Sequence, residues 1–140
     1  MMKMRKHMGG VTLLELMIVV VIVAILAMVS YPNYREFAAR AKRNEAKAAL
    51  LRVATQQERF YLQNSRFAND LTELGYAAAV FITESDTYAV QITGADAANF
   101  TAEADYRPSD IEENRCNLFT IDGRGTKTSD PLNDCWTRTR

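Results

Sequence analysis

Side chains that commonly carry out chemistry are few in this sequence. The only histidine is His7, and the two cysteines are Cys116 and Cys135. Catalytic triads and most metal sites need histidine or further cysteines, and no glycine-rich phosphate loop or paired-carboxylate motif is present. The sequence therefore predicts no catalytic residue, no metal and no cofactor, although scattered Asp and Glu could still act as general bases. The number of cysteines alone does not decide between a disulfide and free thiols, because this depends on the compartment of the protein.

A glycine pair precedes the most informative segment. Gly9 and Gly10 end a short basic stretch, and an apolar run of nineteen residues follows, VTLLELMIVVVIVAILAMV, from Val11 to Val29. As a helix this run would be roughly 28 Å long, which is about the thickness of a bilayer's hydrocarbon core. Because backbone groups in lipid must bond to one another, we expect a membrane-spanning helix.

Small residues before the apolar run indicate a cut that keeps the helix. A secretory signal peptidase requires small residues after the run, and Ile25–Pro32 offers no such pattern. We predict cleavage between Gly10 and Val11. A plain N-terminal anchor and a secretory signal peptide are the alternatives.

Glu15 places a carboxylate inside the apolar run. A charge within a membrane helix costs about 2.5–3.5 kcal/mol, so it needs a partner. Cleavage would create one, the α-amino group of Val11, which is cationic at neutral pH. The pair could form within one helix or between neighbouring helices. The alternative is a side chain that reaches the membrane interface.

The segment Gly10–Met17 (GVTLLELM) resembles the prepilin signature of type IV pilins and type II secretion pseudopilins, usually G-F-T-L-x-E-L, with Val11 in place of Phe. The resemblance implies that prepilin peptidase cuts after Gly10 and N-methylates Val11. It also implies that Glu15 acts in subunit recruitment and assembly.

Much of the remaining chain is similar to PilE-type minor pilins. The similarity lies in Gln57–Tyr76, in the turn Asp122–Gly125 and in Asp134–Trp136. It implies a type IV pilin fold and a structural, non-catalytic role as a minor subunit of a type IV pilus, with adhesion, twitching motility or DNA uptake among the family's functions. A type II secretion pseudopilin and a DNA-binding uptake pilin are the alternatives.

The resemblance also implies partners and a location. The partners are other pilin subunits, prepilin peptidase and the assembly machinery of the inner membrane. The subunit would cross the inner membrane once, with its N-terminus cytoplasmic, and later enter an extracellular filament. Charge alone does not decide this orientation, because basic residues flank both ends of the apolar run.

Four segments are predicted along the chain. Residues 1–10 form a cleaved basic leader, residues 11–31 a hydrophobic assembly helix and residues 32–63 its soluble amphipathic half; residues 64–140 contain a loop, antiparallel strands and a disulfide-closed C-terminal region. Pro32 lacks a backbone donor, so we predict that it interrupts the helix between its two halves.

The soluble part has the pattern of an α+β fold. Ala46, Leu50, Val53, Gln57 and Phe60 share one helical face. Alternation within residues 88–92, residues 100–104 and residues 118–122 predicts a small antiparallel meander. Between these elements, residues 64–76 read as a loop with a short helix, capped by Asn69 or Asp70 and ended near Gly75.

For a domain outside the cytoplasm, a disulfide between Cys116 and Cys135 is favoured over single reactive thiols, as in many type IV pilins. Closing this loop would contribute about 3 kcal/mol. The disulfide argues against a major pseudopilin, whose relatives use bound calcium instead, and Asp122–Gly125 has too few oxygen ligands for a calcium loop.

Charge gives little support for nucleic-acid binding. The chain has 17 basic and 17 acidic residues, and loss of residues 1–10 would leave 14 and 17, a side-chain charge of −3. The cationic candidates are Arg124, Lys127, Arg138 and Arg140, which lie among Asp122, Asp130 and Asp134. A second basic run, from Arg35 to Arg52, is interpreted as a solvated or subunit-contact face, and a phosphate-binding stripe is the alternative.

Overall fold

The structure is a computed structural model that describes residues 10–108 and 115–137. The chain forms two compact units, the first ending at Phe37 and the second beginning at Ala38. Nearly all of the predicted basic leader, including His7, lies outside the described residues, as do Arg138 and Arg140.

One long helix, α1, runs from Leu13 to Asn64 and contains 52 residues. It passes through Pro32 without a break, so the predicted interruption of the helix is wrong. Proline removes the N–H that would bond to the Met28 carbonyl, but the flanking backbone bonds remain, and Asn33 Nδ2 donates to the Val29 carbonyl (3.2 Å). The loss of one donor therefore does not end the helix.

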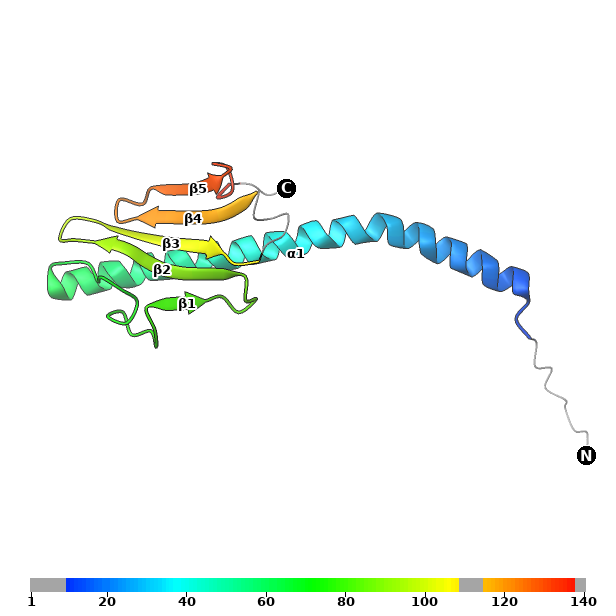
Figure 1. The fold of residues 1–140 in the computed structure, drawn as a ribbon, viewed down its shortest axis with the longest axis horizontal. Coiled ribbons are helices and arrows are strands. Elements are labelled where there is room, and N and C mark those ends of the chain that lie inside the picture. The colour runs from blue at the N-terminus through cyan, green and yellow to red at the C-terminus, as the bar shows by residue number, and fades with distance from the viewer. Residues whose placement is uncertain (1–9, 109–114, 138–140) are drawn as a thin grey trace, which may run out of the picture. The chain divides into compact units, whose positions relative to one another are not determined.

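Five antiparallel strands follow in chain order and form one meander (Figure 1). They are β1 (Val80–Ile82), β2 (Tyr88–Ala95), β3 (Phe100–Tyr106), β4 (Cys116–Asp122) and β5 (Lys127–Pro131). The three predicted strands are confirmed as β2, β3 and β4. The two short edge strands, β1 and β5, were not predicted, because neither has an alternating apolar pattern.

The second half of α1 covers one face of this sheet (Figure 1). The predicted inward face of the helix is buried at Ala46, Leu50, Val53 and Gln57, whereas Phe60, near the end of the helix, is only partly buried. The sheet contributes the alternate residues of its central strands: Tyr88, Val90, Phe100, Ala102, Ala104, Tyr106, Phe119 and Ile121. The apolar face of α1 and the alternate residues of the central strands thus pack into one core, as expected for an α+β fold.

The loop after α1 is held by a turn rather than by the predicted short helix. Asp70 Oδ1 accepts a hydrogen bond from Thr72 N (2.8 Å), and Gly75 has a φ of 92°. Asp70 therefore acts as the predicted cap and Gly75 as the predicted stop. The five residues between Asp70 and Tyr76 form a single turn, because a helix this short gains too few backbone bonds to propagate.

Candidate functional site

The predicted cleavage point lies just before α1. Gly10 and Val11 have no regular structure, and both are exposed. Thr12 begins the helix: its carbonyl accepts from Leu16 N (3.1 Å), and its Oγ1 accepts from Glu15 N (3.2 Å). The Gly10–Val11 bond therefore lies outside the helix in exposed chain.

Glu15 occupies the first turn of α1 and is exposed. A carboxylate in this position is favoured by the helix dipole, since the free N–H groups of the first turn carry partial positive charge. Among the described residues its side chain has no ion-pair partner. Glu15 is thus available for a partner that comes from outside a single, uncleaved chain.

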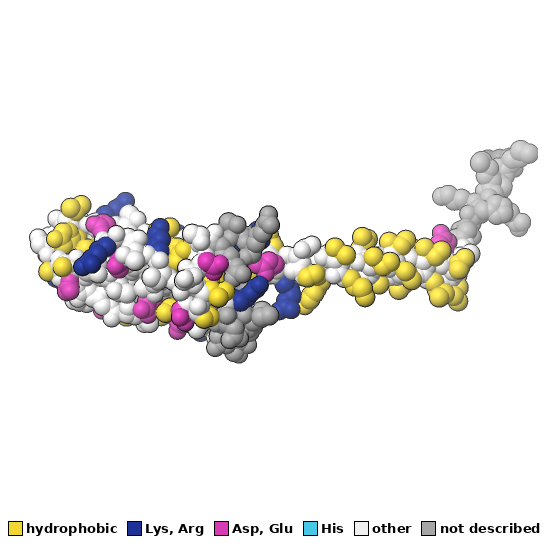
Figure 2. Space-filling view, turned by 90° about the horizontal axis from the view of Figure 1, so that it is seen from above, with side chains coloured by type: hydrophobic (Ala, Val, Ile, Leu, Met, Phe, Trp, Pro, Cys, Tyr) yellow, Lys and Arg dark blue, Asp and Glu magenta, His cyan; other side chains and the backbone are white. Residues whose placement is uncertain are grey.

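The apolar run of α1 is exposed along its whole length. Its large side chains have exposed fractions from 51% at Ile22 to 78% at Met28, and apolar side chains cover this segment on the face seen in Figure 2. In the part of the chain that the structure describes, one helix is long and apolar enough to cross a membrane, and its most apolar window is 0% buried. So much exposed apolar surface requires a covering of lipid or of other apolar helices.

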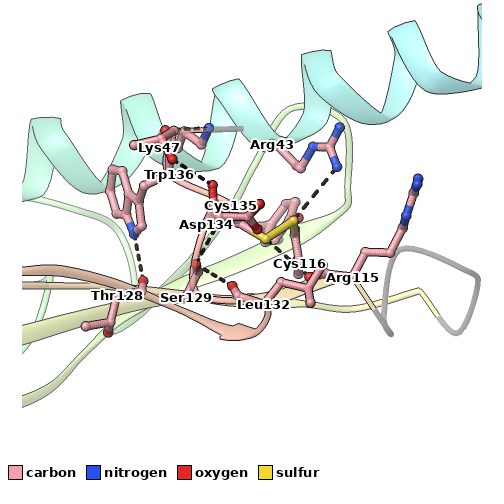
Figure 3. Close-up of a disulfide and its surroundings, with 12 residues drawn as sticks. Arg43, Lys47, Arg115, Cys116, Thr128, Ser129, Leu132, Asp134, Cys135 and Trp136 are labelled. Atoms are coloured by element: carbon pink, nitrogen blue, oxygen red, sulfur yellow. Dashed lines mark hydrogen bonds between the residues drawn. A yellow bond between two sulfur atoms is a disulfide. The ribbon is translucent and has the colours of Figure 1, made fainter. Parts of the chain in front are cut away.

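The predicted disulfide between Cys116 and Cys135 is confirmed. It joins the start of β4 to the chain that follows β5, and both cysteines are fully buried (Figure 3). Tyr88 Oη donates to the Cys116 carbonyl (2.9 Å), which fixes the disulfide to the middle of the sheet.

Trp136 and Lys47 attach the C-terminal segment to its surroundings (Figure 3). Trp136 Nε1 donates to the Thr128 carbonyl (2.6 Å), and Lys47 Nζ donates to the Trp136 carbonyl (3.1 Å). Partial burial of Lys47, together with the charge of Arg43, lowers the pKa of its ammonium group. Lys47 is therefore a structural contact rather than a free surface cation.

The basic side chains of α1 differ in how far they are buried. Arg43 is only 2% exposed, and its Nη1 donates to Cys116 Sγ (3.8 Å). The interpretation of this run as a solvated or subunit-contact face is therefore wrong for Arg43. A buried cation needs compensating contacts, and the sequence pattern alone did not distinguish it from the exposed Arg52.

The two described cationic candidates near the C-terminus differ in their contacts. Arg124 and Lys127 are exposed, but Lys127 Nζ lies 5.4 Å from the centre of the Trp136 ring. Asp122 Oδ1 accepts from Arg124 N (3.0 Å) and Thr126 N (2.7 Å), so this carboxylate orders the turn. Desolvation, the largest single effect, raises the pKa of Asp122, but the hydrogen bonds from Thr126 and Arg124 and the charge of Arg124 together lower it below its usual value.

Two family models match the sequence. One, described as "Type IV minor pilin ComP, DNA uptake sequence receptor", matches residues 32–120. The other, the prokaryotic N-terminal methylation motif, matches residues 5–31. Together they match residues 5–120, which include most of each compact unit.

A curated relative is similar to part of the chain. The type IV major pilin protein PilA of Myxococcus xanthus is 44% identical over 68 residues. The matched stretch is 49% of this chain but only 31% of that protein.

Two solved structures have a similar fold. The minor pilin PilV of Neisseria meningitidis is 23% identical, with a TM-score of 0.52 over 69% of this chain and 91% of that chain. A type IV pilin from Shewanella oneidensis is 20% identical, with a TM-score of 0.50 over 71% of this chain and 99% of that chain. The long helix, the five-stranded sheet and the disulfide of this chain thus form the type IV pilin fold, to which both structures are similar.

Proposed function

This chain belongs to the type IV pilins, in the ComP-like family of minor pilins, and we propose that it is cleaved between Gly10 and Val11 and assembled into a filament through α1. Residues 1–10 would be the leader that prepilin peptidase removes. Val11 would then be N-methylated and become the first residue of the mature subunit. Before assembly the subunit would be held in the inner membrane by residues 11–31, with its N-terminus cytoplasmic.

The single observation that carries this proposal is the exposed apolar helix with one carboxylate beside the cleavage point. The apolar run is uncovered from Val11 to Val29, and Glu15 is the fifth residue after the bond to be cut. Lipid and the apolar helices of other subunits can each cover the same surface. Membrane storage and filament assembly are then two alternative environments for one helix.

Glu15 would select the position of each incoming subunit. Its carboxylate is costly in an apolar environment, and the amino group of Val11 on a neighbouring chain would neutralise it. The helix dipole alone is screened and weak at an exposed end. The ion pair would therefore be most favourable at one axial offset between two subunits.

The test of processing is the mass of the N-terminal peptide of protein isolated from its host. We expect a chain that begins at Val11 and is heavier by one methylene group. A chain beginning near Tyr31 would indicate a secretory cut, and an intact N-terminus in cells with active prepilin peptidase would indicate a plain anchor. Either result would contradict the proposal. Gly10→Val should leave the chain uncut.

The test of assembly compares the loss of the Glu15 carboxylate with the loss of another carboxylate on the same helix. Glu15→Gln should be processed normally but should lose incorporation into sheared filaments. Glu58→Gln removes an exposed carboxylate in the soluble half of the same helix and should be incorporated like the wild type. Equal incorporation of both variants would exclude Glu15 from assembly.

DNA binding during uptake is a second candidate function. It is favoured by the match of residues 32–120 to a family described as a receptor for DNA uptake sequence. The proposal requires exposed cations without nearby acidic partners, because phosphate contacts provide most of the affinity of proteins for DNA. Binding of duplex DNA that weakens as salt increases is the expected result, whereas a purely structural pilin should retain little DNA.

A further inference from the structure

Three large aromatic side chains follow the apolar run of α1 and are not covered. Tyr31, Tyr34 and Phe37 have exposed fractions of 65%, 71% and 67%. None of them stacks on another aromatic ring among the residues that the structure describes, whereas Phe67 and Phe100 of the second unit are buried and contact each other. The folded chain therefore gives these three side chains no apolar environment of its own.

The three aromatic side chains lie along one side of the helix. Successive residues of an α-helix are rotated by about 100°, so the three occupy an arc of about 120°. Arg35 extends this arc to about 160°, and its guanidinium carbon lies 6.0 Å from the centre of the Tyr31 ring. Glu36 falls on the opposite side of the helix and is partly buried. We call Tyr31, Tyr34, Arg35 and Phe37 the aromatic stripe.

The aromatic stripe has the axial length of a membrane interface. The nineteen apolar residues that end at Val29 match the hydrocarbon core, and the stripe begins two residues later. From Tyr31 to Phe37 the helix rises by about 9 Å. The headgroup layer on each side of a bilayer is roughly 5–8 Å thick. A helix with the ordinary tilt of a membrane span therefore places the whole stripe within this layer.

The side chains of the aromatic stripe suit the chemistry of that layer. Tyrosine combines an apolar ring with a polar hydroxyl group and is enriched at membrane interfaces. Arg35 can lay its methylene groups against lipid while its guanidinium group stays at the level of the phosphates, whose oxygens it binds through two parallel hydrogen bonds. Because no carboxylate lies on the same side of this turn, an anionic headgroup meets no repulsion there.

We propose that the aromatic stripe binds the headgroup layer of an anionic membrane, at the end of the span away from Gly10. The inference rests on the membrane-held state proposed above and adds the residues that fix the depth and rotation of the helix in it. Since the stripe occupies one side of α1, it turns that side toward the lipid surface. Transfer into a filament then requires release of the stripe from the headgroups as well as release of the apolar run from the hydrocarbon core.

The test measures the depth of a spin label in lipid vesicles. Ser30→Cys places one labelled thiol beside the stripe, since both native cysteines are joined in a disulfide. In the full chain, reconstituted in vesicles of phosphatidylcholine and phosphatidylglycerol, oxygen should reach the label and a neutral, water-soluble nickel chelate should not. Tyr31→Ala, Tyr34→Ala and Phe37→Ala combined should shift the label toward the chelate. Tryptophan at the same three positions should keep the wild-type depth, because it has the same preference for the interface.

Leu62→Ala is the matched control for the aromatic side chains. It removes an apolar side chain that is 84% exposed, in the same helix but far from the span, and it should leave the depth of the label unchanged.

The contribution of Arg35 is tested through the charge of the lipid. The wild-type label should be better shielded from the chelate in vesicles with phosphatidylglycerol than in phosphatidylcholine alone. Arg35→Gln should lose this difference, and Arg35→Lys should keep it. Arg59→Gln removes an exposed arginine from the soluble half of α1 and should respond like the wild type. A difference that persists in Arg35→Gln would overturn the contact between Arg35 and the headgroups.

The remaining outcomes separate this inference from the proposed function. If the wild-type label is shielded and the alanine variant has the same depth, the aromatic stripe is wrong while the membrane-held state stands. An alanine variant that keeps its depth but is missing from sheared filaments would show that the stripe is a contact between subunits instead. If the chelate reaches the wild-type label freely, the membrane-held state and the stripe are both wrong.

Discussion

Gln57 is a polar side chain that the core of this pilin fully encloses. Its Nε2 donates to the Ala68 carbonyl (2.9 Å), and its Oε1 accepts from Ala68 N (2.8 Å). The amide thus pairs with a backbone peptide in the way that a neighbouring strand would. This pairing attaches the loop after α1 to the helix and satisfies all the buried polar groups involved.

Replacement of Gln57 by Leu should lower the free energy of unfolding by about 1–3 kcal/mol, because the buried N–H and carbonyl of Ala68 lose their partner. Chemical denaturation of the full chain in detergent measures the change. Gln63→Leu, on an exposed position of the same helix, should alter stability by less than about 0.5 kcal/mol. Equal effects of the two substitutions would show that the Gln57 bonds contribute nothing.

At the scale of elements, β5 depends on the disulfide. Its sequence, KTSDP, has little apolar surface, and four of its five residues are exposed. β5 pairs with β4 from Ile121 to Cys116, and Cys135 ties the chain beyond it to the start of β4. The covalent link therefore supplies the stability that burial does not.

A double Cys116→Ala and Cys135→Ala variant should lose about 3 kcal/mol of stability, the entropic contribution of a closed loop of this length. Hydrogen exchange should increase first in the amides of β5, while α1 and β3 stay protected. Wild-type protein treated with a reductant is the control and should behave like the variant. Unchanged exchange in β5 would contradict its dependence on the disulfide.

The elements that the sequence predicted are those with a strong repeating pattern. The helical face through Leu50 and Val53 and the alternation of β2, β3 and β4 reflect burial of every second or every third to fourth side chain. β5 could not be found in this way, because its pairing is imposed by tertiary contacts. For the candidate site, the sequence indicated Gly10, Val11 and Glu15, whereas the difference between the buried Arg43 and the exposed Arg52 became visible only with the packing of α1 on the sheet.

At the scale of the whole molecule, several carboxylates stabilise loops only when they are ionised. Hydrogen bonds from Ala98 N and Asn99 N lower the pKa of Asp96. A hydrogen bond from the Thr72 side chain lowers that of Asp70, and one from Arg66 lowers that of Glu73. All three groups therefore bind protons more weakly in the folded chain than in the unfolded chain.

The stability of the protein should consequently fall in acid. The contribution of these groups is complete above the unfolded pKa values of about 4 and is lost as the pH falls through the lower folded values. Urea unfolding of the full chain at a series of pH values measures this loss. Asp96→Asn keeps an oxygen acceptor for the loop but removes one titrating group, so its stability should depend less steeply on pH below about 4. An unchanged dependence would contradict the role of Asp96.

The two sheet edges restrict how copies of this chain can aggregate. β1 has only three residues, and β5 presents Lys127, Asp130 and Pro131 at the other border. Short strands, charges and proline at an edge all oppose the addition of a strand from another molecule. Growth by strand addition, the route to amyloid, is thus disfavoured at both ends of the sheet. Crowded subunits can therefore expose long apolar helices to one another while their sheets stay separate.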